Sequence, residues 1–88
     1  MGHHKVKRNE FRLDDGAKVS IEYWVNATKI YVAAFDTAGH QISRAAYHAD
    51  VEDPAALTPE LLESLVGSLA NALEYELINH PELSIRPR

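Results

Sequence analysis

Histidine and carboxylate side chains are the residues of this sequence that could carry acid–base chemistry. Glu76 and His80 are four positions apart, a spacing that places both side chains on one face of a helix. A buried carboxylate beside an imidazole occurs in acid–base sites and also in structural pairs. We favour the structural pair. In addition, Gly67-Ser68 lacks the Gly-x-Ser-x-Gly frame of a nucleophile motif. The chain is therefore predicted to be non-enzymatic, with no catalytic residue.

The spacing of the histidines gives little support for a metal site. His40, His48 and His80 fall in a predicted turn, a strand end and a helix end, without the spacing of a ligand set. His48, Asp50 and Glu52 alternate as in a strand and could gather a cation. A solvated loop is the favoured interpretation of these three residues, and we predict no metal site.

His3 and His4 lie beside the amino terminus, where amine, amide and imidazole nitrogens together can chelate Cu(II) or Ni(II). The same pair is also typical of a cloning remnant. The absence of cysteine excludes disulfides, thiolate zinc sites, iron–sulfur clusters and cysteine nucleophiles. The four glycines do not form a phosphate-binding loop, so no cofactor is predicted.

The length and composition predict a single small domain over residues 1–88. The 88 residues are 45% hydrophobic and 25% charged, which is ordinary globular composition. A chain this short buries only about 60–65% of its unfolded surface, so a partner or a second copy would add stability. The longest apolar run, residues 30–35, is far below the ~20 residues needed to span a bilayer. We expect a cytoplasmic protein.

Charge is distributed unevenly along the chain. Residues 1–44 contain seven basic and five acidic side chains, a net charge of +2. Residues 45–88 contain two basic and eight acidic side chains, a net charge of −6. The basic surface is therefore expected on the first half of the fold and the acidic surface on the second.

The first half of the sequence, about residues 5–48, alternates in polarity between turn residues and predicts four strands. Gly16 in the bulge position of a three-residue loop would pair Phe11 with Val19 and Leu13 with Ala17. Side chains of the second strand that would face the core are Val19, Ile21, Tyr23 and Val25.

Two further turns complete the predicted meander. Asn26-Ala27 can close a second hairpin that pairs Tyr23 with Ile30. Asp36 to Gly39 carries Asp at the first and Gly at the last position of a type I turn. A fourth strand is predicted at about residues 40–48, with mixed patterns that leave its register weakly specified.

The second half predicts a loop over residues 49–57, a helix over 58–80 and a short tail over 81–88. Thr58 is a favourable N-cap, and Pro59 suits the first helical position. The helix should end near His80, because Pro81 disfavours helical geometry in the residue before it. The apolar stripe that would cover the sheet is Leu61, Leu62, Leu65, Val66, Leu69, Leu73 and Leu77. Side chains expected to face outward include Glu60, Glu63, Ser64, Asn71 and Glu74.

These elements predict an α+β domain: a four-stranded antiparallel β-meander with one C-terminal helix packed on one face, in two layers. One sheet face would then remain uncovered, and aromatic and basic side chains would gather on it. Such a patch is typical of a binding surface. The predicted binding residues are Trp24, Tyr31, Phe35, Tyr47, Arg8, Arg12, Lys18 and Lys29.

Three functions fit such a surface. The favoured one is a small interaction module that forms a homodimer through the uncovered face. A second is binding of single-stranded DNA or RNA, with bases stacked on the aromatic side chains and phosphates on the basic ones. A third is an accessory or inhibitor protein of the phage or mobile-element type, whose acidic helix binds a larger protein partner.

Overall fold

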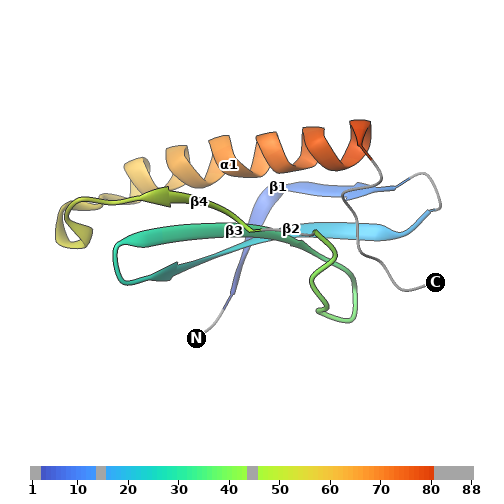
Figure 1. Ribbon diagram of the computed structural model, residues 1–88, viewed down its shortest axis with the longest axis horizontal. Coiled ribbons are helices and arrows are strands. Elements are labelled where there is room, and N and C mark those ends of the chain that lie inside the picture. Colours follow the sequence, from blue (N-terminus) through green and yellow to red (C-terminus); the bar gives the residue numbers. More distant parts are fainter. Residues whose placement is uncertain (1–2, 14–15, 44–45, 81–88) are drawn as a thin grey trace.

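Four strands and one long helix make up the described part of the computed structural model, which comprises residues 3–13, 16–43 and 46–80. The strands form one antiparallel sheet in the order β1-β2-β3-β4, and the helix lies on one face of it (Figure 1). The elements are β1 (His4–Arg12), β2 (Lys18–Asn26), β3 (Lys29–Phe35), β4 (Tyr47–Asp50), the 3-10 helix η1 (Pro54–Ala56) and α1 (Pro59–Asn79). The predicted ββββα arrangement is confirmed.

The first hairpin has the predicted register at its turn. Phe11 pairs with Val19, and the Leu13 amide donates to the Ala17 carbonyl at 3.0 Å. Gly16 has a φ of +87°, the left-handed conformation that the bulge position requires. The two aspartates of the loop lie outside the described residues.

Farther from the turn, β1 departs from regular pairing. Lys5 pairs with Glu22 and Glu10 pairs with Ser20, so residues 6–9 lie opposite Ile21 alone. A bulge of this kind bends its strand, and β1 turns sharply at this point (Figure 1). The sequence did not predict this bulge.

Asn9 connects the bulge to α1. Its side chain is 3% exposed, and its amide nitrogen donates to Asn71 Oδ1 at 3.1 Å and to Glu74 Oε1 at 3.2 Å. Asn71 is exposed, as predicted, whereas Glu74 is half-buried. Both side chains accept from Asn9 and so satisfy an amide that would otherwise be buried without a partner.

The second hairpin turns one position later than predicted. Ala27 and Thr28 form the turn, Ala27 with a φ of +54°, and Val25 pairs with Ile30. This register places two apolar β-branched side chains opposite each other, whereas the predicted one leaves Val25 opposite the polar Thr28. Because each pairing shifts by two residues, every side chain stays on its predicted face.

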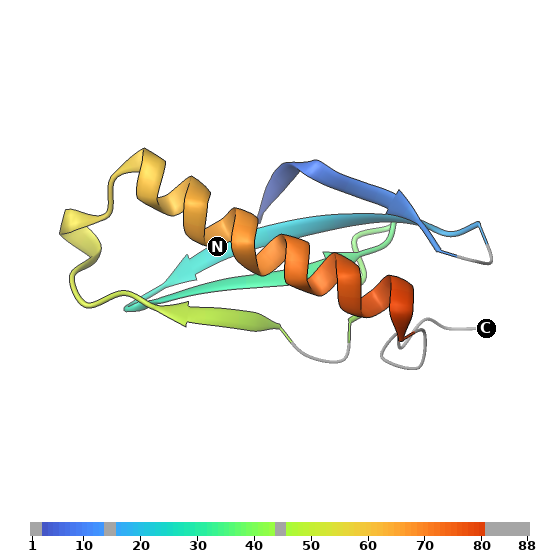
Figure 2. The same ribbon diagram turned by 90° about the horizontal axis from the view of Figure 1, so that it is seen from above.

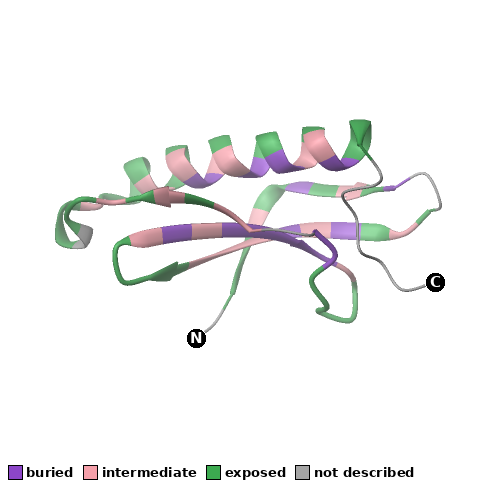
Figure 3. Cartoon of the chain, viewed as in Figure 1, coloured by how far each residue is buried: buried purple, intermediate pink, exposed green. Residues whose placement is uncertain are grey.

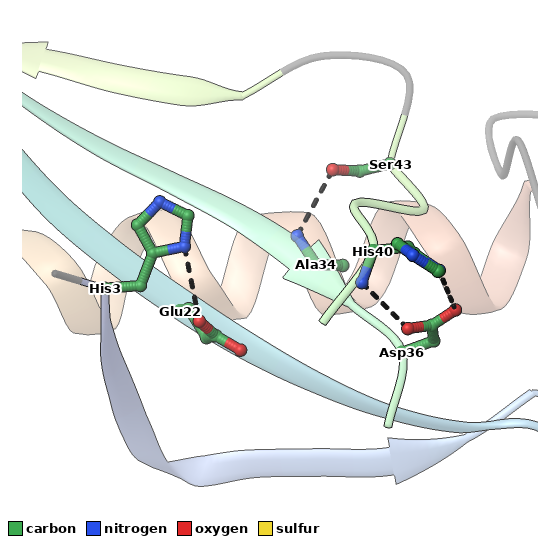
Figure 4. A network of polar contacts seen from close by, with 6 residues as sticks. All are labelled: His3, Glu22, Ala34, Asp36, His40 and Ser43. Carbon is green, nitrogen blue, oxygen red and sulfur yellow. Dashed lines mark hydrogen bonds and ion pairs between the residues drawn. The ribbon is translucent and has the colours of Figure 1, made fainter. Parts of the chain in front are cut away.

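The fourth strand is shorter and begins later than predicted. Instead of residues 40–48, β4 comprises Tyr47–Asp50, and Gln41 forms only an isolated bridge with Phe35. Asp36 Oδ1 accepts the backbone amides of Ala38 and His40, each at 2.9 Å. The Ala34 amide then donates to the Ser43 hydroxyl at 3.2 Å, so a side chain replaces the main-chain partner of a regular ladder (Figure 4).

Tyr47 pairs with Val32 and packs against the core beneath α1. Burial raises the pKa of the Tyr47 phenol above its ordinary value of 10.0, and the negative charge of Glu76 raises it further.

The core lies between α1 and the sheet face that it covers. Figure 3 shows the buried positions of α1 on its sheet-facing side. The core cluster is Leu13, Val19, Ile21, Ile30, Val32, Ala34, Ile42, Val66, Ala70, Leu73 and Leu77. Leu61, predicted to belong to the apolar stripe, is 48% exposed.

Both predicted ends of the helix are confirmed. The Thr58 hydroxyl accepts the Leu61 amide at 3.2 Å, and Pro59 occupies the first helical position. His80 is the C-cap, and its amide donates to the Glu76 carbonyl at 2.7 Å.

Gly67 lies in the middle of α1, and a Cβ at this position meets no atom within 4 Å. Gly67→Ala is expected to raise the free energy of unfolding by about 1 kcal/mol, because alanine loses less backbone entropy in a helix. Urea denaturation followed by circular dichroism measures the change.

Gly16→Ala is the matched control, since Gly16 is equally open but has a φ of +87°. The same added methyl should lower stability here by about 1–2 kcal/mol, because alanine is strained in the left-handed region. Changes of the same sign at both positions would contradict the assigned backbone conformations.

Tyr47 provides a test of the β4 register by pH titration. Glu76→Gln is expected to lower the Tyr47 pKa, but to leave it above 10.0 because burial is the larger cause. The folded state then holds the phenolic proton more tightly than the unfolded state. Stability should therefore fall as the pH rises through 10.0 toward the raised value.

NMR of the tyrosine ring carbons, assigned with Tyr47→Phe, measures this pKa. A Tyr47 pKa at the ordinary value would contradict the placement of this ring beneath α1. An unchanged pKa in Glu76→Gln would show that the carboxylate does not face the phenol.

Candidate functional site

Aromatic side chains of β2 and β3 gather on the sheet face opposite α1. Trp24 pairs with Tyr31, and their rings stack with centroids 5.4 Å apart and an interplanar angle of 13°. Phe35 meets Trp24 edge-on at 6.4 Å. Trp24 and Tyr31 are half-buried, whereas Phe35 is only 5% exposed. These three predicted binding residues are therefore brought together, and Trp24 and Tyr31 form the accessible part.

His3 covers part of this face. Its ring stacks on Trp24 at 4.6 Å and lies 4.9 Å from Phe35, while its Nδ1 is 3.4 Å from Glu22 Oε1 (Figure 4). The beginning of β1, which follows His3, runs on the side of the sheet opposite α1 (Figure 1). Interpretation of His3 as a metal-chelating residue or a cloning remnant missed this packing role. We call His3, Trp24, Tyr31 and Phe35 the aromatic cluster.

Tyr47, a predicted member of this surface, is not on it. Because Tyr47 pairs with Val32, its side chain lies on the core face beneath α1. His48 takes the expected position instead: it pairs with Tyr31, and the two ring centroids are 6.0 Å apart. The sequence prediction failed here because the fourth strand lacked a clear alternation on which to fix its register.

Arg8 is also misplaced by the prediction. It lies in the bulge of β1 and lines a cleft between that strand and α1, on the other side of the sheet. The extra residues of the bulge break the alternation that would have placed Arg8 beside Glu10 and Arg12.

The remaining predicted basic residues lie on the expected face, each beside an acceptor. Lys18 Nζ is 3.8 Å from Glu10 Oε2, and Lys29 Nζ is 3.5 Å from Asp50 Oδ1. Arg12 Nη1 donates to the Gly16 carbonyl at 3.2 Å. Exposed pairs like these add little stability. They do neutralise the two lysines locally, so this face has charges of both signs around an aromatic centre.

The other candidate sites in the sequence are a metal site and the Glu76–His80 pair. Among residues 3–13, 16–43 and 46–80, no group of three His, Cys, Asp or Glu side chains is placed to hold a metal ion. His80 Nε2 is 4.0 Å from Glu76 Oε2, the predicted pair. The Glu76 side chain is 38% exposed, however, and thus lacks the burial that would tune it for acid–base work. No helix in the described part of the chain is long and apolar enough to cross a membrane.

Comparison of the chain with protein-family models, with curated proteins and with solved structures gives no match. The candidate site is therefore defined by its own geometry. It consists of the stacked Trp24 and Tyr31, the two imidazoles beside them, and a surrounding ring of paired charges.

Proposed function

We propose that this protein is a non-enzymatic interaction module that forms a homodimer through the sheet face opposite α1. The observation that supports this most directly is the half-buried stack of Trp24 on Tyr31, which α1 cannot reach. Aromatic side chains are enriched at the centres of protein interfaces, where they contribute large contact areas with few rotatable bonds.

The charges around the stack suit a second copy of the same chain. Two ion pairs, Lys18–Glu10 and Lys29–Asp50, place positive and negative charges on one face. In a two-fold dimer the same patch meets itself, so a surface with both signs can pair cation with carboxylate across the interface. A phosphate backbone, in contrast, requires a surface of predominantly positive charge.

Chain length supports the same proposal. A domain of 88 residues buries a smaller fraction of its unfolded surface than a larger domain does, so further apolar burial against a second copy adds to a thin stability.

Sedimentation equilibrium tests the dimer. Wild-type protein is expected to dimerise, and Trp24→Ala to raise the dissociation constant about thirty-fold or more, the effect of losing ~2 kcal/mol at an interface centre. Tyr75→Ala is the matched control, because Tyr75 is 64% exposed on α1. Circular dichroism establishes that both variants are folded.

A monomeric wild type at high concentration would contradict the proposal, as would an unchanged dissociation constant in Trp24→Ala. The first result would leave the aromatic cluster to a different, larger protein partner.

Single-stranded nucleic acid is the second candidate, because bases can stack on the exposed parts of Trp24 and Tyr31. The pairing of Lys18 and Lys29 with carboxylates argues against it. Titration of Trp24 fluorescence with single-stranded DNA and RNA at low salt is expected to give no saturable quenching. Saturable quenching that weakens as salt is added would instead establish a phosphate-dependent nucleic-acid surface.

A further inference from the structure

A cleft of about 620 Å³ lies on the helix side of the sheet, between the first half of β1 and the N-terminal half of α1. Its volume falls in the range of ligand and peptide sites, about 300–1,000 Å³. Apolar side chains from both walls line it, including Val6 of β1 and Leu62 and Val66 of α1. The cleft is on the opposite side of the sheet from the aromatic cluster.

The bulge in β1 accounts for the cleft. Asn9 ties the strand to Asn71 and Glu74 in the second half of α1. The cleft lies toward the N-terminus of both elements, where Gly67 presents no side chain to fill the space. Figure 2 shows α1 running obliquely across the sheet, with β1 to one side of it.

The β1 wall of the cleft is positively charged. Lys5, Lys7 and Arg8 line it and are exposed. Within the residues that the structure describes, none of these three side chains has an ion pair or a hydrogen bond. Glu63 is the carboxylate on the α1 wall. Lys5 is the cross-strand partner of Glu22, which lies on the face opposite α1, so Lys7 and Arg8 are the two cations that the bulge adds to the cleft wall.

β1 is also an edge strand, since the sheet order is β1-β2-β3-β4. One side of its backbone therefore has no neighbouring strand, which is the feature that extended peptides use when they bind beside a sheet. An edge strand, an adjacent helix and an apolar cleft between them together make a groove for an extended chain.

We propose that this cleft binds an acidic peptide segment of a partner protein in extended conformation. Alternate apolar side chains of the peptide enter the cleft over Leu62 and Val66, and its carboxylates meet Lys7 and Arg8. The alternation of an extended chain allows both contacts at once. The charge of the β1 wall selects an acidic peptide over a basic one.

The probe is a peptide selected from a phage-displayed library of random sequences. Each peptide has about ten residues and spans ~33 Å when extended. Peptides that the wild-type protein enriches are expected to contain Asp or Glu together with bulky apolar residues. A synthetic copy of the most enriched peptide, labelled with fluorescein, then gives dissociation constants by anisotropy. Binding should weaken as salt is added.

Gly67→Leu places a side chain in the cleft, and the Cβ of that side chain begins in open space. It should weaken peptide binding about tenfold or more. Ser68→Leu is the matched control, since it adds the same side chain to the exposed neighbouring position, which does not line the cleft. Arg8→Glu should also weaken binding about tenfold, whereas Arg12→Glu, on the same strand and the opposite face, should change it less than about twofold.

No enrichment, or enrichment of peptides without acidic residues, would overturn the proposal. Equal losses in Gly67→Leu and Ser68→Leu would do the same. The dimer is measured separately by sedimentation, and all four variants leave Trp24 and Tyr31 unchanged. Failure of the peptide site is therefore distinguishable from failure of the proposed self-association.

Discussion

One helix cannot cover a four-stranded sheet, and the two surfaces for which we propose binding roles follow from that limit. A helix with its side chains is about 10–12 Å across, whereas adjacent strands lie about 4.8 Å apart. α1 runs obliquely over the sheet with the edge strands on either side of it (Figure 2). Its buried residues Val66, Ala70, Leu73 and Leu77 close the core. The first half of β1 and the whole opposite face are beyond its reach.

The two uncovered regions differ in the side chains that they present. On the opposite face, aromatic rings stack on one another and His3 adds a further layer, so the surface is partly closed within one molecule. Beside β1, Tyr23 is the aromatic residue among the described residues that line the cleft, and His4 stacks on it at 5.1 Å, but the basic side chains Lys7 and Arg8 have no partners there. The first surface is therefore suited to packing and the second to electrostatic attraction. Because they lie on opposite sides of the sheet, both can be occupied together.

Local sequence signals were sufficient for most of the fold. Thr58-Pro59 marks the start of the helix, and Gly16 fixes the first hairpin at Phe11 and Val19, because each signal acts through neighbouring residues. The bulge in β1 has no such signal. It depends on the bonds from Asn9 to Asn71 and Glu74, which are 62 and 65 positions away in the sequence. A contact of that separation could not be deduced from the alternation of β1 alone.

Errors of register had unequal consequences for the candidate site, because side chains alternate between faces with a period of two. The shift of two residues between β2 and β3 left Trp24 and Tyr31 on the expected face. The bulge in β1 and the late start of β4 instead changed the face of Arg8 and Tyr47.

The number of basic residues in the sequence also could not show which surface has cations without a neighbouring carboxylate. Lys29 lies beside Asp50 only in the observed pairing of β3 with β4, whereas Lys7 and Arg8 lie in a bulge that has no carboxylate. The residues are of the same chemical type, and the neighbours that the fold supplies decide which of them can attract a partner's charge.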